Sequence, residues 1–202
     1  MNITTLTKEN PKLETVLNYQ PIFWVNDKYE GIDKANERSK YSAADVKDAE
    51  DRLKRFAPYF NEYFPETRDR NGIIESDLSE IPEFKHFLEA HYDTSIKGDL
   101  LLKRDDTLPI AGTIKARGAI YEVLKHAEDV ALEAGILDGY DDDYTKFGSQ
   151  AFKDVFSQYK IMVGTTGNLG ISVGVMSAAF GFDVTVHMSY DCLLYTSLMA
   201  RG

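Results

Sequence analysis

The sequence predicts an α/β protein in which a parallel sheet has helices on both faces and follows a helical N-terminal extension. Two observations predict this class. Residues 160–163 and 183–188 are predicted to be short strands, and a small-residue helical segment at 171–180 lies between them. A span of about 29 residues suits two parallel strands joined by a right-handed crossover helix. Residues 1–97 carry helical patterns separated by polar turns, which indicates a separate extension.

The composition indicates a folded protein without a nucleic-acid or membrane role. The 202 residues are 43% apolar, which is enough to build a core. The net charge of −10 gives no positive field that would attract phosphate backbones or anionic lipids. The sequence has no stretch of about 18 apolar residues and no secretory leader. Cys192 is the only cysteine, and with four scattered histidines it gives no metal-binding cluster. We expect a cytoplasmic protein that holds no metal.

Two helices are predicted within the extension. Ser42–Asp45 resembles a capping box, and it precedes apolar side chains spaced three or four residues apart. These side chains are Val46, Ala49, Leu53 and Phe56. We expect Pro58 to end or kink this helix. A second helix is expected from near Ser79 to Tyr92, with Pro82 in its first turn.

The pattern changes at Gly98, where we place the start of the α/β domain. The apolar run Asp99–Arg104 is consistent with a buried strand. A polar turn then leads into a helix predicted from Thr113 to about Ala134, which Gly135 closes. The acidic stretch Asp138–Tyr144 is expected to be a solvated surface connection, because its spacing does not fit a calcium-binding loop.

A glycine-rich turn, residues 164–170, joins the first strand of the predicted pair to its helix. Its spacing is G-x-x-G-x-x-G, so it is neither the dinucleotide-binding fingerprint nor a P-loop. Glycines allow close backbone approach, and the amides that open the following helix favour an anion. The turn is therefore either a site for a phosphate or carboxylate, or a tight connection whose glycines serve packing.

Lys115 is the second candidate for chemistry. It enters a helix at its N-terminus, where the positive end of the helix dipole disfavours a cation. The neutral amine is the form that condenses with carbonyl compounds. Taken alone, a lysine at such a place is more often simply solvated, and Arg117 is then only a surface charge.

Together the two motifs carry a resemblance to a known family. Residues 113–118 read TIKARG, and residues 165–170 read TTGNLG after a strand. This pair resembles the fold type II pyridoxal-phosphate enzymes, which include the serine and threonine dehydratases and the tryptophan synthase β subunit. The resemblance covers nearly all of residues 40–191. Further similar segments are residues 55–59, 72–76, 102–105, 108–110, 120–124 and 184–189.

The resemblance implies pyridoxal 5′-phosphate as the cofactor and assigns the site residues. Lys115 would form the covalent bond to the cofactor and transfer the proton at the substrate's α-carbon. Asn168 would hydrogen-bond the cofactor's ring hydroxyl, and Thr166 would act with neighbouring amides on the substrate carboxylate. The implied substrate-binding set is Thr165, Thr166, Gly167, Asn168 and Leu169.

The resemblance also implies the reaction, an elimination that converts a β-hydroxy amino acid to a keto acid and ammonia. The long N-terminal extension favours the members that act on D-serine over the L-threonine and L-serine dehydratases. A non-catalytic α/β module that binds a small anion at residues 164–170 is the alternative from another class.

Members of the family are longer than this chain. Their second glycine-rich loop, which receives the cofactor phosphate, follows the part that this sequence resembles. We therefore expect residues 98–191 to be the N-terminal part of an incomplete cofactor-binding domain. Residues 192–202 depart from the family pattern, and we expect a non-native tail there. The chain alone is expected to be inactive and to bind the cofactor weakly or not at all, whereas the full-length enzyme is expected to be a monomer.

Overall fold

The computed structural model describes residues 2–190, so Cys192 and the predicted non-native tail lie outside the described residues. The chain divides between Ala44 and Asp45 into two compact units. Each unit is described by itself. No helix within residues 2–190 combines the length and the apolar character that crossing a membrane requires.

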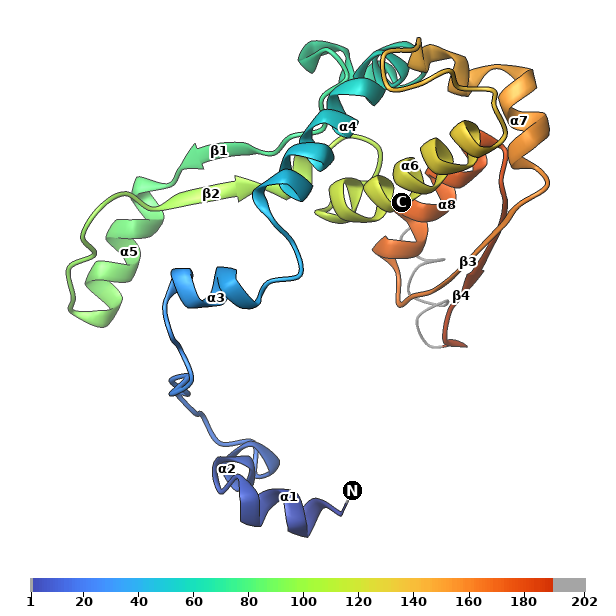
Figure 1. Ribbon diagram of the computed structural model, residues 1–202. Coiled ribbons are helices and arrows are strands. Elements are labelled where there is room, and N and C mark those ends of the chain that lie inside the picture. Colours follow the sequence, from blue (N-terminus) through green and yellow to red (C-terminus); the bar gives the residue numbers. More distant parts are fainter. Residues whose placement is uncertain (1, 191–202) are drawn as a thin grey trace. The chain divides into compact units, whose positions relative to one another are not determined.

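The first unit holds three short helices, α1 (Ile3–Glu9), α2 (Lys12–Leu17) and α3 (Ile32–Arg38) (Figure 1). The side chain of Asn2 caps α1 by accepting a hydrogen bond from the Thr4 amide at 3.1 Å. None of the three helices contains a buried residue, and Tyr19 is 96% exposed. Helices of six or seven residues gain little stability without tertiary packing. Residues 2–44 include no buried side chain, so the described part of this unit has no core that would stabilise its helices.

The second unit alternates helices and strands around one core. In chain order its elements are α4 (Ala43–Tyr63), η1 (Pro65–Arg70), β1 (Asp77–Glu80), α5 (Pro82–Tyr92), β2 (Leu101–Arg104), η2 (Asp105–Thr107), α6 (Lys115–Glu133), η3 (Tyr144–Gly148), α7 (Gln150–Phe156), β3 (Lys160–Gly164), α8 (Asn168–Phe180) and β4 (Asp183–His187), where η marks a 3-10 helix. The α/β class is confirmed. The predicted division at residue 97 stays a prediction.

Aromatic side chains from several elements form the centre of the core. Phe56 of α4 lies edge-on to Tyr144 and Phe147, with ring centroids 4.9 and 4.7 Å apart. Phe180 of α8 packs on the same ring at 6.0 Å. Such pairs contribute about 0.5–1.5 kcal/mol each beyond the area that they bury. The core therefore joins α4, η3 and α8 across more than half of the sequence.

Helix α4 continues through Pro58 to Tyr63, so Pro58 does not end it, and a kink at Pro58 stays a prediction. An interior proline costs a helix about 3 kcal/mol, because it removes one hydrogen bond and crowds the preceding turn. Tyr59 and Phe60 follow the proline and are each 1% exposed. Burying two aromatic side chains offsets that cost, at about 1.5–3 kcal/mol for each large apolar side chain.

The predicted strand–helix–strand unit is confirmed. Strands β3 and β4 pair in parallel, from Lys160 opposite Asp183 to Gly164 opposite His187, and α8 connects them. Helix α8 begins at Asn168, three residues earlier than predicted. A methyl group at Gly170 would lie 2.5 Å from Thr165 Cγ2 and 2.7 Å from Val186 Cγ1. At this position the glycine serves packing, because it allows the helix to approach the sheet.

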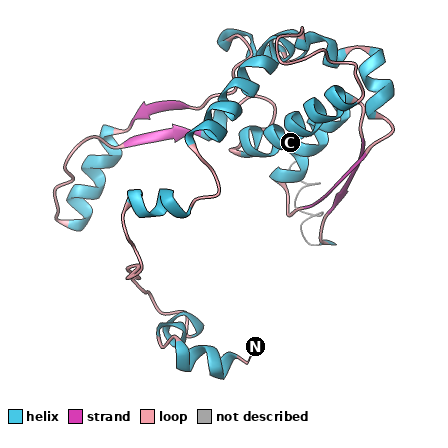
Figure 2. Cartoon of the chain, viewed as in Figure 1, coloured by secondary structure: helices cyan, strands magenta, loops and turns pink. Residues whose placement is uncertain are grey.

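The strand predicted at Asp99–Arg104 is shorter, antiparallel and exposed. β2 pairs with β1, with Ser79 opposite Leu102, and the side chains of Leu101 and Leu102 stay 49% and 46% exposed. The prediction that this strand is buried was therefore wrong. Figure 2 shows the two strand pairs as separate sheets. The larger parallel sheet with helices on both faces stays a prediction.

The helix predicted from Ser79 begins instead at Pro82. Ser79 belongs to β1, and Ile81 precedes the proline with φ −129° and ψ 62°. Proline disfavours the helical conformation in the residue before it and is well suited to a helix's first position. Both effects place the start of α5 at Pro82 itself. The predicted helix from Thr113 to Ala134 is confirmed as α6 within two residues at each end.

Candidate active site

Lys115 is the first residue of α6. Its amide donates a hydrogen bond to Thr113 Oγ1 at 3.2 Å, which fixes the turn that enters the helix. The next residue, Ala116, is fully buried in the core. The Lys115 side chain is exposed, and within residues 2–190 it makes no hydrogen bond or ion pair. The helix end that carries the unpaired amine of Lys115 is therefore held in place by the burial of Ala116 in the core.

The glycine-rich turn is organised by Thr165. The Thr165 amide donates to the carbonyl of His187 in β4 at 2.9 Å. Its hydroxyl accepts hydrogen bonds from the amides of Gly167 at 3.1 Å and Gly170 at 3.3 Å. Two of the amides predicted to face an anion are therefore occupied by the turn itself. The Thr165 hydroxyl, predicted for substrate binding, serves here as an internal cap.

The remaining donors of the turn are free. Thr166 and Asn168 are exposed, and among the described residues their side chains make no hydrogen bond. The amides of Thr166, Asn168 and Leu169 likewise meet no acceptor in that part of the chain. Amides at a helix N-terminus with no partner in the protein attract anionic groups. The turn therefore keeps both side-chain and backbone donors available for a ligand.

Helices α6 and α8 pack against each other, and their buried residues belong to one core (Figure 1). Ala and Val side chains of α6 belong to this core together with Val173 and Met176 of α8. Among residues 2–190, no hydrogen bond joins Lys115 to the glycine-rich turn. Packing thus brings together the two helices that begin with Lys115 and Asn168, while the side chains of Lys115, Thr166 and Asn168 stay unpaired among the described residues.

A buried ion network at the other end of α6 was not predicted. Glu128 is fully buried and accepts hydrogen bonds from Arg52 Nε at 2.7 Å, Arg55 Nε at 2.9 Å and Tyr144 Oη at 2.6 Å. Burial raises the pKa of Glu128, but the hydrogen bonds from Arg55, Tyr144 and Arg52 outweigh it and leave the pKa below its ordinary value. Burial and the bond to Glu128 raise the pKa of Tyr144.

One feature of the sequence indicates this network, a charged residue on the apolar face of α6. Leu124, Ala127, Glu128 and Ala131 share one buried helical face, so the carboxylate stands among core side chains. A charge on the apolar face of a helix indicates a buried partner elsewhere in the chain. The network ties α4, α6 and η3 together and takes no part in the candidate site.

Asp142 of the acidic loop is hydrogen-bonded by two amides of the loop and by Lys146. Asp142 accepts from the amides of Asp138 at 3.0 Å and Asp143 at 2.6 Å, and from Lys146 Nζ at 2.5 Å. Lys146 and these amides lower the pKa of Asp142 to about 2. No group of three or more His, Cys, Asp or Glu side chains within residues 2–190 is arranged to hold a metal ion.

The fold and the site define a class: an α/β protein with a free lysine at one helix N-terminus and a donor-rich glycine turn at another. No family model matches the chain. It is 52% identical over 200 residues to the probable D-serine dehydratases of Bacillus cereus and Bacillus anthracis. These matches cover 99% of this chain and 45% of the relatives. The probable D-serine dehydratase of Geobacillus stearothermophilus is 52% identical over 195 residues, 96% of this chain and 42% of the relative.

The chain is thus a homologue of the D-serine dehydratases, which confirms the relationship predicted from its motifs. It spans less than half the length of the relatives that it matches.

Proposed function

We propose that this chain carries part of the active site of a D-serine dehydratase, a pyridoxal-phosphate-dependent lyase that converts D-serine to pyruvate and ammonia. One observation supports this most directly. The residue that the family resemblance makes the cofactor lysine, Lys115, has a free side chain on an anchored helix end, in a chain 52% identical to D-serine dehydratases.

The residues present fit the cofactor. An aldehyde condenses with a free primary amine, and the amine of Lys115 has no competing partner among the described residues. The ring hydroxyl of the cofactor and the carboxylate of the substrate are acceptors that need donors. Asn168 offers a side-chain amide for the first, and the amides of Thr166 and Leu169 suit the second. Thr165 supports both by holding the turn in shape.

Each residue then has a task in the elimination. When bound, the cofactor supplies an electron-withdrawing ring that takes up the charge left by loss of the α-proton. Lys115 Nζ moves that proton at the α-carbon. Thr166 and the free amides orient the carboxylate without burying a full counter-charge. Loss of the α-proton and of the β-hydroxyl together removes one water from D-serine. Hydrolysis of the resulting 2-aminoacrylate would release pyruvate and ammonia.

We also propose that β3, α8 and β4 belong to a larger parallel sheet of the fold type II class, with residues 1–97 as its extension. Parallel sheets occur almost only with several strands and with both faces covered. A parallel pair of two strands, each with a free outer edge in the described residues, supports that arrangement. The whole enzyme is proposed to be a cytoplasmic monomer that acts on a small amino acid and holds no metal.

The test compares the 202-residue chain with the same chain extended to the length of its relatives. We expect pyruvate from D-serine in the extended protein, little or none from the short chain, and none from extended Lys115→Arg. Arginine keeps the charge but does not condense with the cofactor. Pyruvate formation that survives Lys115→Arg contradicts the proposal. Preference for L-threonine or L-serine would instead assign the chain to those dehydratases, and ligand binding without catalysis would favour an anion-binding module.

A further inference from the structure

Lys115 follows a ten-residue connection, residues 105–114, that leads from β2 into α6. Two neighbouring residues far earlier in the sequence contact both ends of this connection. Ser76 Oγ donates a hydrogen bond to Asp105 Oδ1 at 2.6 Å, at the beginning. Glu75 forms an ion pair with Arg117, in the first turn of α6, just beyond the end. Lys103 Nζ reinforces the beginning, with contacts of 2.6 Å to both Ser76 Oγ and Asp105 Oδ1.

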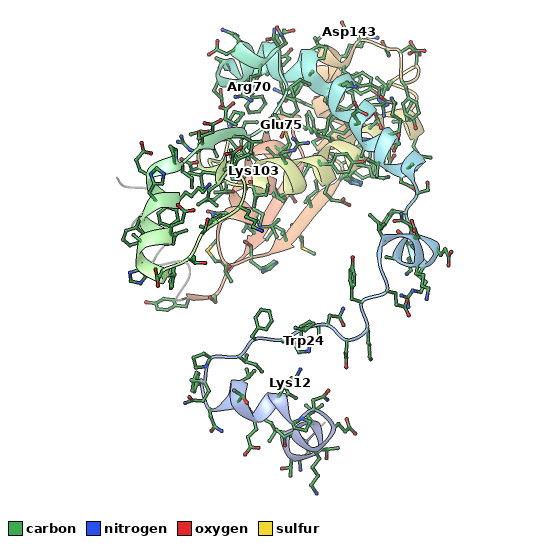
Figure 3. All side chains as sticks on the ribbon, turned by 90° about the vertical axis from the view of Figure 1, so that its left-hand side faces the viewer. Lys12, Trp24, Arg70, Glu75, Lys103 and Asp143 are labelled. Atoms are coloured by element: carbon green, nitrogen blue, oxygen red, sulfur yellow. The ribbon has the colours of Figure 1, made fainter. Side chains whose placement is uncertain are left out.

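The segment that carries Glu75 is itself firmly placed. Gly72 has φ +80°, and a side chain there would lie 1.8 Å from the carbonyl oxygen of Ala57, so the backbone packs directly on α4. Ile74 is buried in the core. Arg70 donates to the carbonyl of Glu75 at 3.0 Å. Figure 3 shows Arg70, Glu75 and Lys103 on the same part of the second unit.

The first turn of α6 needs a negative charge from elsewhere. It contains no acidic residue, and its uncharged side-chain acceptor is Thr113 Oγ1, yet it carries two cations, Lys115 and Arg117. Cations at a helix N-terminus meet the positive end of the helix dipole, whereas a carboxylate stabilises that end. Glu75 supplies this carboxylate across 42 residues of sequence. Its ion pair therefore both neutralises Arg117 and attaches the start of the helix to the segment rooted on α4.

We infer that Glu75 is a positioning residue for Lys115: through Arg117 it fixes the helix turn from which the reactive amine projects. Ser76 fixes the other end of the same connection through Asp105. The inference rests on the proposed function of Lys115. The role of Glu75 in holding the helix start is separately measurable.

The test reverses each charge and then both, as Glu75→Arg, Arg117→Glu and the double variant, in the chain extended to the length of its relatives. Two readouts are used: amide hydrogen exchange of residues 113–118, and the ratio of cofactor label on Lys115 to that on Lys125. Label is fixed by borohydride at excess pyridoxal phosphate. Lys125 lies on the same helix, so unfolding of the helix would change both lysines together. Asp51→Arg, which breaks the exposed Lys47–Asp51 pair of α4, is the matched control.

In Glu75→Arg we expect two- to fivefold faster exchange at residues 113–118 and a label ratio lowered by a similar factor, the scale of an exposed ion pair replaced by repulsion. The double variant should return both readouts to within about twofold of the unaltered chain. Asp51→Arg should change neither. Unchanged exchange in Glu75→Arg, or failure of the double variant to recover, would overturn the positioning role. Absence of label on Lys115 in the unaltered extended chain, with exchange responding as expected, would contradict the proposed function instead.

Discussion

The two ends of α6 differ in the burial and in the hydrogen bonding of their charged side chains. Near the C-terminal end, Glu128 is fully buried and accepts hydrogen bonds from three side chains, Arg52 and Arg55 of α4 and Tyr144 of η3. At the N-terminal end, Lys115 is exposed and has no partner among the described residues. A buried charge must be fully satisfied to be tolerated, whereas a nucleophile must keep its reacting atom free. One helix thus carries a buried stabilising carboxylate near one end and, at the other, the exposed amine that we propose for the chemistry.

Removing the buried carboxylate of Glu128 should have the largest effect on the stability of the fold. Glu128→Ala leaves Arg52 and Arg55 without their shared carboxylate, and removing one partner of a buried ion pair costs about 3–5 kcal/mol. We expect the midpoint of urea-induced unfolding to fall sharply at pH 7. A loss below about 1 kcal/mol would mean that solvent or neighbouring acids replace the carboxylate. Asp129→Ala, which removes an exposed acid on the same helix, is the control.

The same carboxylate should make stability depend on pH. Because the folded protein lowers the pKa of Glu128, its stabilising contribution is present above the ordinary glutamate pKa and is lost as the pH falls through the folded-state value. The unfolding midpoint of the unaltered chain should therefore decrease below about pH 4.5. Glu128→Gln should show a smaller decrease over the same range. Equal decreases in both proteins would assign the acid sensitivity to other carboxylates.

A smaller effect is expected where α8 meets the sheet. Gly170→Ala places a methyl group within 2.7 Å of side-chain atoms of Thr165 and Val186. Overpacking of this kind costs about 1–3 kcal/mol. Thermal unfolding should show a lower midpoint for Gly170→Ala than for Gly118→Ala, since the space around Gly118 is open. Equal midpoints would mean that α8 shifts without cost.

The smallest stability effect concerns the cap of the turn. Thr165→Val keeps the shape of the side chain but removes the acceptor for the amides of Gly167 and Gly170. Each lost bond should cost about 0.5–1.5 kcal/mol. Urea unfolding measures this loss, and Thr166→Val, whose hydroxyl has no partner in the described part of the chain, should be nearly neutral. An unchanged free energy of unfolding in Thr165→Val would contradict the stabilising role of this hydroxyl.

Local patterns made part of this structure predictable. The β3–α8–β4 unit and α6 were predicted correctly because their apolar periodicity, glycines and caps lie within each segment. The exposed pairing of β1 with β2 was missed, since it depends on a partner about 25 residues away and not on the apolar run itself. The prediction of Pro82 in the first turn of α5 was confirmed, while the start near Ser79 was wrong because Ser79 pairs with Leu102 in the β1–β2 sheet.

The site shows the same division. Lys115, Thr166 and Asn168 were identified from motifs, and their predicted roles await experiment. The internal role of Thr165 was missed because it depends on the exact fold of the turn. Glu75 was missed because its contact with Arg117 joins segments 42 residues apart. Sequence motifs thus identified the groups left free for chemistry, while the groups that hold them in place required the structure.

The most direct test of the account is a peptide map of the chain extended to the length of its relatives, after pyridoxal phosphate and borohydride treatment. The account predicts that the label lies on Lys115 and that other lysines carry only traces, because Lys115 alone would meet the donors of residues 166–169. Label spread evenly over exposed lysines, with none in excess on Lys115, would contradict it.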